Sequence, residues 1–322
     1  MKMLEVNDLT VSLLTKNGYA NAVSNLSFTL SKGEILGIAG ESGSGKTMTA
    51  LTLLGLLPHR AQVSGSIAFK GQELVGINPK KIQEIRGNQI SMVFQDPMTA
   101  LHPMLTIRTL LTEHMLIHLG ITQKEANSRA EGLLNDVRIP DPKRALLAHP
   151  GQFSGGMRQR IAIAIALACE PEILLADEPT TALDVTVQAG ILRLLDRLRK
   201  ERDLSVIFIT HDLGVLSSVT DKLLVMYGGR EAESGPTKDL LVKPRHPYTQ
   251  GILDSLPDPN HPEKSLSSIK GFPPELGSVK EGCAFASRCS FVQEPCGSGL
   301  ITPTEISQAH RIFCPVDPLV SR

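Results

Sequence analysis

The sequence lacks the features of a protein that spans a membrane or is exported through one. Its most apolar stretch, Ile161–Cys169, is half as long as the run of ~18 apolar residues that suggests a membrane-spanning helix. The first residues, MKMLEVNDLTV, contain no apolar signal-peptide core. We therefore expect a cytoplasmic protein that reaches a membrane only through a partner.

The sequence also has no excess of positive or negative charge. The chain of 322 residues has 33 Lys and Arg against 33 Asp and Glu, so its overall charge attracts neither nucleic acid nor anionic lipid. Hydrophobic residues make up 41% and charged residues 20%, as in an ordinary globular protein, and the length suggests about two domains. The function must therefore be sought in local motifs.

Cysteine is nearly absent outside one segment. Cys169 stands alone in an apolar run, where we expect it in the core, and the other four follow the pattern Cys283-x₅-Cys289-x₆-Cys296-x₁₇-Cys314. Disulfides are rare in a reducing cytoplasm, and a thiolate cage would cross-link this small tail. Because the pattern has no CxxC pair, we favour a [4Fe–4S] cluster, with Zn²⁺ and free thiols as the alternatives.

Short apolar strands alternate with helical patterns, which is typical of βαβ units around a parallel sheet. Buried strands are expected at Glu34–Ala39, Ile173–Ala176 and Ser205–Thr210. Thr47–Leu57 is apolar enough to form a buried helix, which Pro58 limits.

Other segments depart from this alternation. Leu4–Leu13 and Ala22–Leu30 alternate as antiparallel strands do, and Ser66–Gly71 predicts a hairpin. A helical stretch covers about residues 106 to 168. Five prolines between Pro257 and Glu281 predict a linker without regular structure.

Residues Gly40–Thr47, GESGSGKT, match the pattern G-x-x-x-x-G-K-[ST]. The glycines let the backbone curl so that its N–H groups face phosphate oxygens, and the following helix adds its positive end. Lys46 is expected to reach the β- and γ-phosphates of ATP, and Thr47 to ligate Mg²⁺. A Gly-rich turn with an incidental Lys is the alternative, which the strand before and the helix after the loop disfavour. The expected ATP-binding residues here are Gly40, Ser42, Gly43, Ser44, Gly45, Lys46, Thr47 and Thr49.

Two carboxylates end the strand Ile173–Ala176. Ligands of parallel sheets lie beyond the carboxyl ends of the strands, so Asp177 is expected to support Mg²⁺ and Glu178 to polarise the attacking water. His211 follows Ser205–Thr210 and can donate to a γ-phosphate oxygen. Many strands end in acids and many loops contain His, so only the phosphate loop gives these residues a function.

Residues 153–160, FSGGMRQR, resemble the signature sequence of ATP-binding cassette (ABC) proteins, LSGGQ, with Phe153 for Leu and Met157 for Gln. Ser-Gly-Gly at the start of a helix is itself an anion-binding arrangement. The resemblance implies that this segment binds the ATP held by the opposite subunit of a pair. The residues concerned are Ser154, Gly155, Gly156, Met157 and Gln159.

The resemblance covers about residues 1–250. It identifies Gln95 in VFQDP with the Gln loop, Asp184 in ALD with the D-loop and His211 in ITHD with the switch His. It implies an α/β P-loop NTPase (RecA-like) core, an antiparallel β subdomain and an inserted α-helical subdomain at about residues 96–168. The catalytic residues are then Lys46, Gln95, Glu178 and His211, and the Mg²⁺ ligands are Thr47, Gln95 and Asp177.

The segment that stacks on adenine departs from the family pattern. The family usually has an aromatic residue near Ser12–Thr15, where this chain has Leu13 and Leu14. Either a Leu packs on the base or Tyr19, a few residues later, replaces the aromatic residue.

Residues 245–250, RHPYTQ, look like a segment of the oligopeptide/dipeptide/nickel importer ATPases, as do residues 95–105. That resemblance implies a cassette at 1–250, a Pro-rich linker at 251–281 and a small Cys-rich extension at 282–322. It also implies peptide uptake at the cytoplasmic face of the cell membrane. The implied partners are a paralogous ATPase in a heterodimer, two permease subunits and an extracytoplasmic binding protein.

Two other functions are alternatives to transport. ABC ATPases that act in DNA repair need a long coiled coil between the phosphate loop and the signature, and the residues between Thr47 and Ser154 are too few for one. ABC ATPases that act in translation usually carry two cassettes in one chain, and here there is one. A small-molecule P-loop kinase has no need of the Ser154–Arg160 segment. We therefore expect no nucleic-acid partner.

Overall fold

The computed structural model describes residues 2–96, 101–180, 183–256, 268–307 and 309–318. The chain forms two compact units. The helical unit comprises Ser31–Glu34 and Gly76–Ile207, and the loop unit comprises Lys2–Leu30, Ile35–Val75 and Phe208 onward. Strand β8 (Ser205–Thr210) is divided between them.

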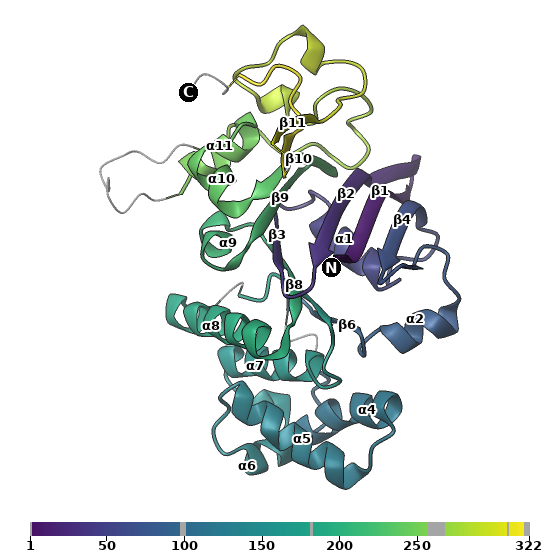
Figure 1. The fold of residues 1–322 in the computed structure, drawn as a ribbon, viewed down its shortest axis with the longest axis vertical. Coiled ribbons are helices and arrows are strands. Elements are labelled where there is room, and N and C mark those ends of the chain that lie inside the picture. The colour runs from purple at the N-terminus through teal and green to yellow at the C-terminus, as the bar shows by residue number, and fades with distance from the viewer. Residues whose placement is uncertain (1, 97–100, 181–182, 257–267, 308, 319–322) are drawn as a thin grey trace. The chain divides into compact units, whose positions relative to one another are not determined.

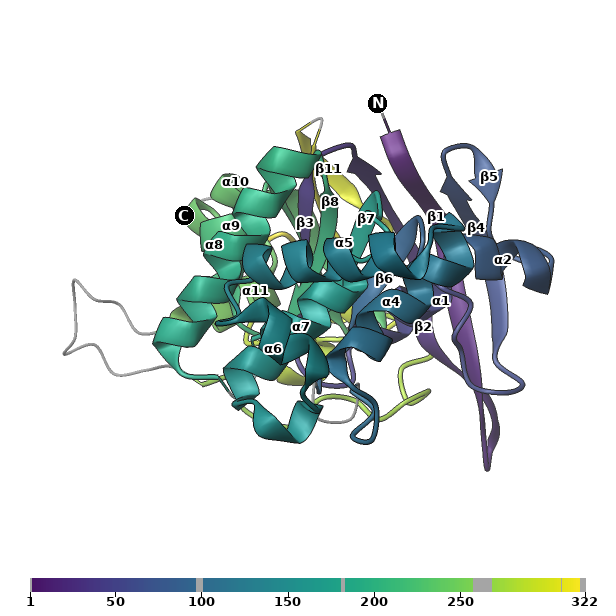
Figure 2. The ribbon, with the colours of Figure 1, turned by 90° about the horizontal axis from the view of Figure 1, so that it is seen from below.

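The helical unit is mainly α-helical, and Figure 2 shows α4, α5, α6 and α7 gathered together. Its two strands, β6 and β7, run parallel with Ile90 opposite Ile173, and all their residues are buried. The elements are α2 (Pro79–Ile85), β6 (Ile90–Val93), α4 (Ile107–Leu119), α5 (Gln123–Asp136), α6 (Pro142–Leu147), η1 (Pro150–Gln152), α7 (Gly155–Ala166), β7 (Ile173–Asp177) and α8 (Val185–Arg202).

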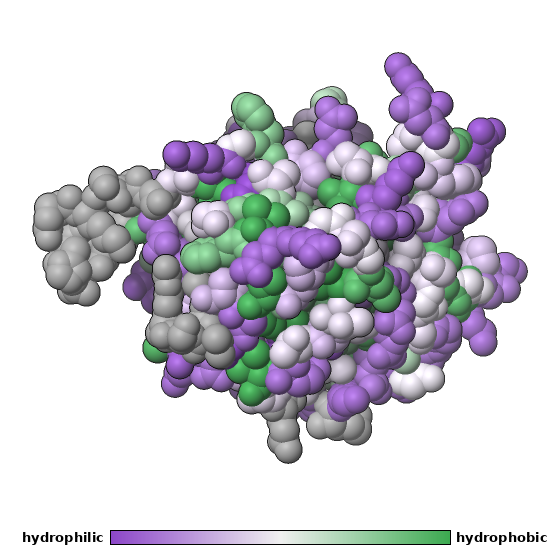
Figure 3. Space-filling view, turned by 90° about the horizontal axis from the view of Figure 1, so that it is seen from above, coloured by the Kyte–Doolittle hydropathy of each residue, from purple (hydrophilic) through white to green (hydrophobic). Residues whose placement is uncertain are grey.

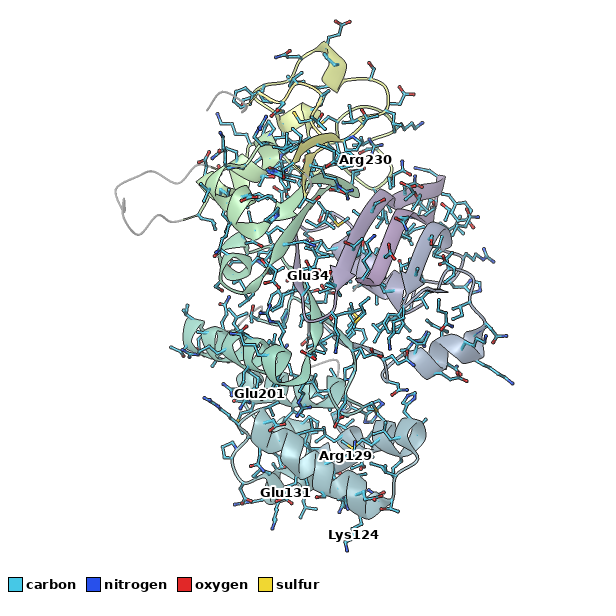
Figure 4. The ribbon with its side chains drawn as sticks, viewed as in Figure 1. Glu34, Lys124, Arg129, Glu131, Glu201 and Arg230 are labelled. Atoms are coloured by element: carbon cyan, nitrogen blue, oxygen red, sulfur yellow. The ribbon has the colours of Figure 1, made fainter. Side chains whose placement is uncertain are left out.

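Local sequence fixes the ends of these helices. Thr106 caps α4, whose other end is Gly120 in the left-handed conformation at φ 61°. Thr122 and Glu125 form a capping box at the start of α5. The buried face of α5 carries Ala126, Ala130, Leu133 and Leu134, whereas Lys124, Arg129 and Glu131 are polar side chains on the same helix (Figure 4). The helical stretch predicted for about 106 to 168 is therefore confirmed.

The loop unit contains two sheets (Figure 1). One has the order β2-β1-β4-β5, with β4 antiparallel to β1 and β5. In the other, β3 is parallel to β9, and β10, β12 and β11 follow in antiparallel pairs. The strands are β1 (Lys2–Thr15), β2 (Gly18–Ser31), β3 (Ile35–Ala39), β4 (Gln62–Phe69), β5 (Gln72–Glu73), β9 (Lys222–Tyr227), β10 (Arg230–Pro236), β11 (Thr304–Ser307) and β12 (His310–Ile312). The helices are α1 (Lys46–Leu53), α9 (Leu213–Val219), α10 (Thr237–Val242), α11 (Pro247–Asp254), η2 (Ala286–Arg288) and η3 (Glu294–Cys296).

The predicted strands and the hairpin are present, but two boundaries differ from the sequence prediction. The helix expected to reach Leu57 ends at Leu53, because Gly55 takes the left-handed conformation at φ 61° and closes the turn. The predicted linker begins inside α11, which continues to Asp254. Part of that linker, residues 257–267, lies outside the described residues.

The C-terminal segment adds strands to the sheet that contains β3. Glu233 of β10 pairs with Ile312 of β12.

Figure 3, the view from above, shows a face on which small hydrophobic patches are separated by hydrophilic side chains. In the part of the chain that the structure describes, no helix is long and apolar enough to cross a bilayer.

Candidate nucleotide-binding and hydrolysis site

The phosphate loop links β3 to α1, and its shape requires glycine. Gly40 and Gly45 have φ of 151° and 98°. A Cβ at Gly40 would lie 2.2 Å from the carbonyl oxygen of Met226, and one at Gly45 would lie 2.6 Å from that of Ala22. Only glycine can take these conformations at such close approach, so the curled loop follows from the sequence.

Lys46 lies inside this curl. Its side chain is buried, with 6% of the residue exposed, and its Nζ donates to the carbonyl oxygens of Gly40 at 2.7 Å and Glu41 at 2.9 Å. Ser44, 2% exposed, accepts a third bond at 3.4 Å. The ammonium is therefore fixed within the loop that would surround a phosphate.

The other predicted ATP-binding residues of the loop unit differ in exposure. Ser42 is exposed and Thr47 half-buried in the first turn of α1. Thr49 is fully buried and its Oγ1 donates to the Gly45 carbonyl at 3.0 Å, so this hydroxyl serves the helix and is not available to ATP in this conformation. Its prediction as an ATP contact finds no support in this placement.

The two alternatives for adenine stacking are both accessible. Tyr19 exposes 49% of its surface and Leu14 46%, while Leu13 is half-buried. Each exposed side chain presents an apolar surface of the kind that a base ring packs against.

In the helical unit, β6 and β7 bring two predicted catalytic residues together. The strands are parallel neighbours with Val93 opposite Ala176, so the residues after their carboxyl ends meet at one edge. There Gln95 Nε2 donates to Glu178 Oε2 at 3.0 Å. Asp177, at the end of β7, is 2% exposed.

Glu178 has an unusual backbone. Its φ is 44°, in the left-handed region that non-glycine residues rarely adopt. Strain of this kind is often concentrated at functional sites, and the strained residue here is the one whose carboxylate accepts from Gln95.

His211 follows β8 in the loop unit and is exposed. The next residue, Asp212, caps α9 by accepting the N–H of Val215 at 3.2 Å. The cap ends the strand and holds the segment that carries His211.

The signature segment starts α7. Ser154 is the N-cap residue, and its Oγ accepts the N–H of Met157 at 3.4 Å. Ser154 and Gly155 are exposed, whereas Gly156 lies against α8, where a Cβ would come within 2.7 Å of Val187. Gln159 differs from these residues, because it is 2% exposed and its Nε2 has no hydrogen-bond partner among the described residues.

Asp184, the predicted D-loop residue, is the N-cap of α8. Its carboxylate accepts the N–H groups of Thr186 at 3.0 Å and Val187 at 2.9 Å, and the hydroxyl of Thr186. These hydrogen bonds, first that from the Thr186 side chain, lower the pKa of Asp184. The carboxylate therefore stays ionised and holds the start of α8 next to Gly156.

The four C-terminal cysteines are free thiols in this structure, Cys296 and Cys314 buried and the other two half-buried. Burial raises the pKa of Cys283 to about 11, and the other three thiols add to the shift, which means that they lie within electrostatic range. Among the described residues, however, no group of three or more His, Cys, Asp or Glu side chains is arranged to hold a metal ion. The described side chains therefore give no support to the metal site expected at the four cysteines, whether iron–sulfur or Zn²⁺. Cys169 is buried, as predicted.

Sequence reasoning missed two residues that contact the phosphate loop. The hydroxyl of Tyr248 accepts the N–H of Glu41 at 2.9 Å, and Arg288 forms an ion pair with the Glu41 carboxylate at 2.7 Å. Glu41 stands at a position where the motif allows any residue, and both partners are distant in the sequence. No local signal could have found the contacts.

Two family models match the chain. The model described as ABC transporter matches residues 23–181, and the model described as the C-terminal region of oligopeptide/dipeptide transporters matches residues 232–296. The oligopeptide transport ATP-binding protein OppD of Salmonella typhimurium is 44% identical over 321 residues, 99% of this chain and 95% of that protein. The dipeptide transport ATP-binding protein DppD of Bacillus subtilis is 48% identical over 315 residues, 97% of this chain and 94% of that protein.

Solved structures agree with these matches. The dimeric structure of MJ0796, a bacterial ABC transporter cassette, has a TM-score of 0.66 and 27% identity, covering 73% of this chain and 99% of that one. The structure of cbiO1 from Clostridium perfringens, part of an ABC transporter complex, has a TM-score of 0.64 and 26% identity, covering 75% and 91%. The chain therefore belongs to the ABC transporter ATP-binding proteins. Within that family it is a member of the oligopeptide/dipeptide subfamily.

Proposed function

We propose that the chain is the ATP-hydrolysing subunit of an ABC importer for oligopeptides or dipeptides. The observation that carries the proposal is the 3.0 Å hydrogen bond between Gln95 and Glu178 at the carboxyl ends of two parallel strands. A carboxylate held there by an amide can orient a water for in-line attack on a γ-phosphate. The similarity to oligopeptide and dipeptide transport proteins along nearly the whole chain supports the cargo class.

In this proposal the phosphate loop binds ATP. Lys46 leaves its bonds to the loop carbonyls and neutralises charge on the β- and γ-phosphates, while His211 donates to a γ-phosphate oxygen. Thr47, Gln95 and Asp177 would hold Mg²⁺, since hydroxyl, amide and carboxylate oxygens suit this hard cation, which offsets phosphate charge when bound. Glu178 positions the attacking water.

The signature turn is proposed to serve the nucleotide of a second subunit. The exposure of Ser154 and Gly155 at the start of α7 supports this role, because an open helix N-terminus attracts anions. The dimeric form of a similar cassette is consistent with it. We propose a paralogous ATPase as the partner subunit, two permease subunits beneath which the pair docks at the cytoplasmic face of the membrane, and an extracytoplasmic binding protein.

The division of the chain is also proposed. Residues 1–250 form the cassette, 251–281 the linker and 282–322 the extension. The match of a separate C-terminal family model to residues 232–296 supports a distinct C-terminal region, which overlaps the proposed end of the cassette, the linker and the start of the extension.

Replacing Glu178 tests the catalytic assignment. Glu178→Gln is expected to retain ATP binding but to lower steady-state hydrolysis by about a hundredfold or more, because one such transition-state contact contributes ~3 kcal/mol. Hydrolysis and ATP affinity should be measured on the assembled transporter, together with uptake of a labelled peptide.

A matched control is Glu131→Gln on α5 (Figure 4). Glu131 is part of a long, exposed contact with Lys143 at 3.9 Å, so its loss should leave hydrolysis unchanged. Normal turnover in Glu178→Gln would refute the catalytic assignment. Failure of the wild-type chain to co-purify with a permease would refute the transport function.

We also propose that Cys283, Cys289, Cys296 and Cys314 hold a [4Fe–4S] cluster. A cluster separates its four thiolates more widely than a single Zn²⁺ does, for which Zn–S bonds of about 2.3 Å bring the sulfurs together. The support for the cluster is that the other three thiols lie within electrostatic range of Cys283.

Anaerobic purification tests the cluster. Iron and acid-labile sulfide in equal amounts are expected in the wild-type chain and in Cys169→Ser, whose thiol lies elsewhere in the core. Cys296→Ser should lose most of both. Absence of sulfide from the wild-type chain would overturn the proposal.

A further inference from the structure

Glu41 is held at three points, although the loop motif does not specify its side chain. Its N–H donates to the hydroxyl of Tyr248 at 2.9 Å, and its carbonyl oxygen accepts from Lys46 at 2.9 Å. Its carboxylate, with 28% of the side chain exposed, accepts from Arg288 Nη1 at 2.7 Å. The conformation of the first turn of the phosphate loop therefore depends on residues from the C-terminal part of the chain.

Arg288 is held firmly where it meets Glu41. Only 6% of its side chain is exposed. Its other donors reach the carbonyl oxygens of Lys270 at 2.9 Å and Ile269 at 3.1 Å, and the hydroxyl of Tyr227 at 3.0 Å. A guanidinium with this many fixed partners loses little freedom when it pairs with one more carboxylate.

Aromatic rings support the same contact. The guanidinium lies over the ring of Tyr227, 5.7 Å from its centroid. The rings of Tyr227 and Tyr248 are 4.6 Å apart, and Phe285 packs against both at 5.2 and 5.3 Å. The two tyrosines that fix Arg288 and the Glu41 backbone therefore belong to one packed cluster.

The charge of Arg288 has a direct consequence for an anionic ligand. Glu41 lies in the loop that binds triphosphate in the proposed function, and an uncompensated carboxylate there would repel it. The ion pair with Arg288 cancels this charge. Because Glu41 is partly exposed, water screens the effect and keeps it moderate.

We propose that Arg288 is a positioning residue for nucleotide binding, which neutralises Glu41 and holds the phosphate loop in its binding conformation. The proposal rests on the proposed ATP function. It makes the C-terminal segment, through one side chain, a determinant of ATP affinity.

Three variants test the charge argument on the full-length chain, with the ATP dissociation constant as the readout. Arg288→Gln leaves the carboxylate uncompensated and should weaken ATP binding about three- to tenfold. Glu41→Gln leaves the positive charge of Arg288 uncompensated and should tighten binding slightly. The double variant restores neutrality and should bind ATP close to the wild-type level.

Arg230→Gln is the matched control (Figure 4). Arg230 also ties the C-terminal segment to a strand, through the carbonyl oxygens of Gly282 at 2.8 Å, Lys280 at 3.1 Å and Val279 at 3.3 Å. These bonds do not involve the phosphate loop. Its loss should lower the melting temperature but leave ATP affinity unchanged.

The outcomes separate the two proposals. If the wild-type chain binds no ATP, the proposed function fails. If it binds ATP but Arg288→Gln binds equally well, or the double variant remains as weak as Arg288→Gln, the role of Arg288 is purely structural and this inference is overturned.

Discussion

The chain has two glycine-rich helix starts that differ in how far the chain itself surrounds them. At the phosphate loop, Lys46 is buried and bonded to the loop, and Glu41 is held by Tyr248 and Arg288. At the signature turn, Ser154 and Gly155 are exposed, and the Oγ of Ser154 accepts the N–H of Met157 at 3.4 Å. One proposed anion site is thus surrounded by residues of its own chain, whereas the other is an open surface.

This difference predicts which of the two sites can bind nucleotide without a partner subunit. A pre-formed loop loses little entropy when phosphate arrives, so it can bind nucleotide without a partner. An open helix start offers N–H groups and a dipole but no cavity, so it becomes a site only when a second surface brings the ligand. Changes at the first site should therefore affect the single chain, and changes at the second only the assembled pair.

The largest expected effect is on the first site. Lys46→Ala removes charge-assisted hydrogen bonds of up to about 3 kcal/mol, so ATP binding by the single chain should weaken by about a hundredfold. Calorimetric titration with Mg²⁺ and ATP measures this, with Lys124→Ala on the exposed face of α5 as the control. A loss below about threefold would mean that the loop is not the principal site.

Acidification should destabilise the part of the fold around His246 and Tyr248, the latter of which contacts the phosphate loop. His246 is buried and accepts the N–H of Tyr248 at 3.0 Å, and burial lowers its pKa to about 4, against the opposing effect of Glu233. Since the folded pKa lies below the unfolded value of about 6.5, the unfolded chain binds the extra proton first, and stability falls as pH drops from about 6.5 toward 4. The loss should reach about 2 kcal/mol by pH 5.

Denaturant unfolding between pH 7 and pH 5 measures that loss. His246→Asn is the control, because Asn can accept the same N–H as an N-cap residue but does not titrate. Its stability should change less with pH over this range. An equal pH dependence in both proteins would contradict the assignment to His246.

The smallest of the three effects concerns the signature turn. Ser154→Asp keeps a good N-cap, so the melting temperature should not change. Its carboxylate would repel a triphosphate, and hydrolysis by the assembled pair should fall about tenfold, a loss of about 1.4 kcal/mol. Binding of ATP by the single chain should stay the same. If single-chain binding fell instead, the two helix starts would not be functionally separate.

Local patterns predicted most of the fold. The alternation in Leu4–Leu13 and Ala22–Leu30 and the hairpin at Ser66–Gly71 depend on near neighbours in the sequence, and β1, β2 and β4 are found there. The loop was predictable for the same reason, because Gly40 and Gly45 meet a steric condition that no other residue meets.

Contacts between distant residues were not predictable. Nothing near Glu41 in the sequence indicates Arg288, and nothing in the motif shows that Thr49 turns its hydroxyl to its own helix. The end of α1 was missed because Gly55 stops the helix before Pro58 does. Roles that depend on a partner, such as that of Ser154, are properties of an assembly and remain proposals from one chain.

The contact between Gly156 and Val187 has a mechanical consequence. Asp184 fixes the first turn of α8 by accepting its N–H groups, and that turn rests directly on the bare backbone of α7. The start of α8 and the signature turn are therefore in direct contact. A larger side chain at residue 156 would collide with Val187 and force the two helix ends apart.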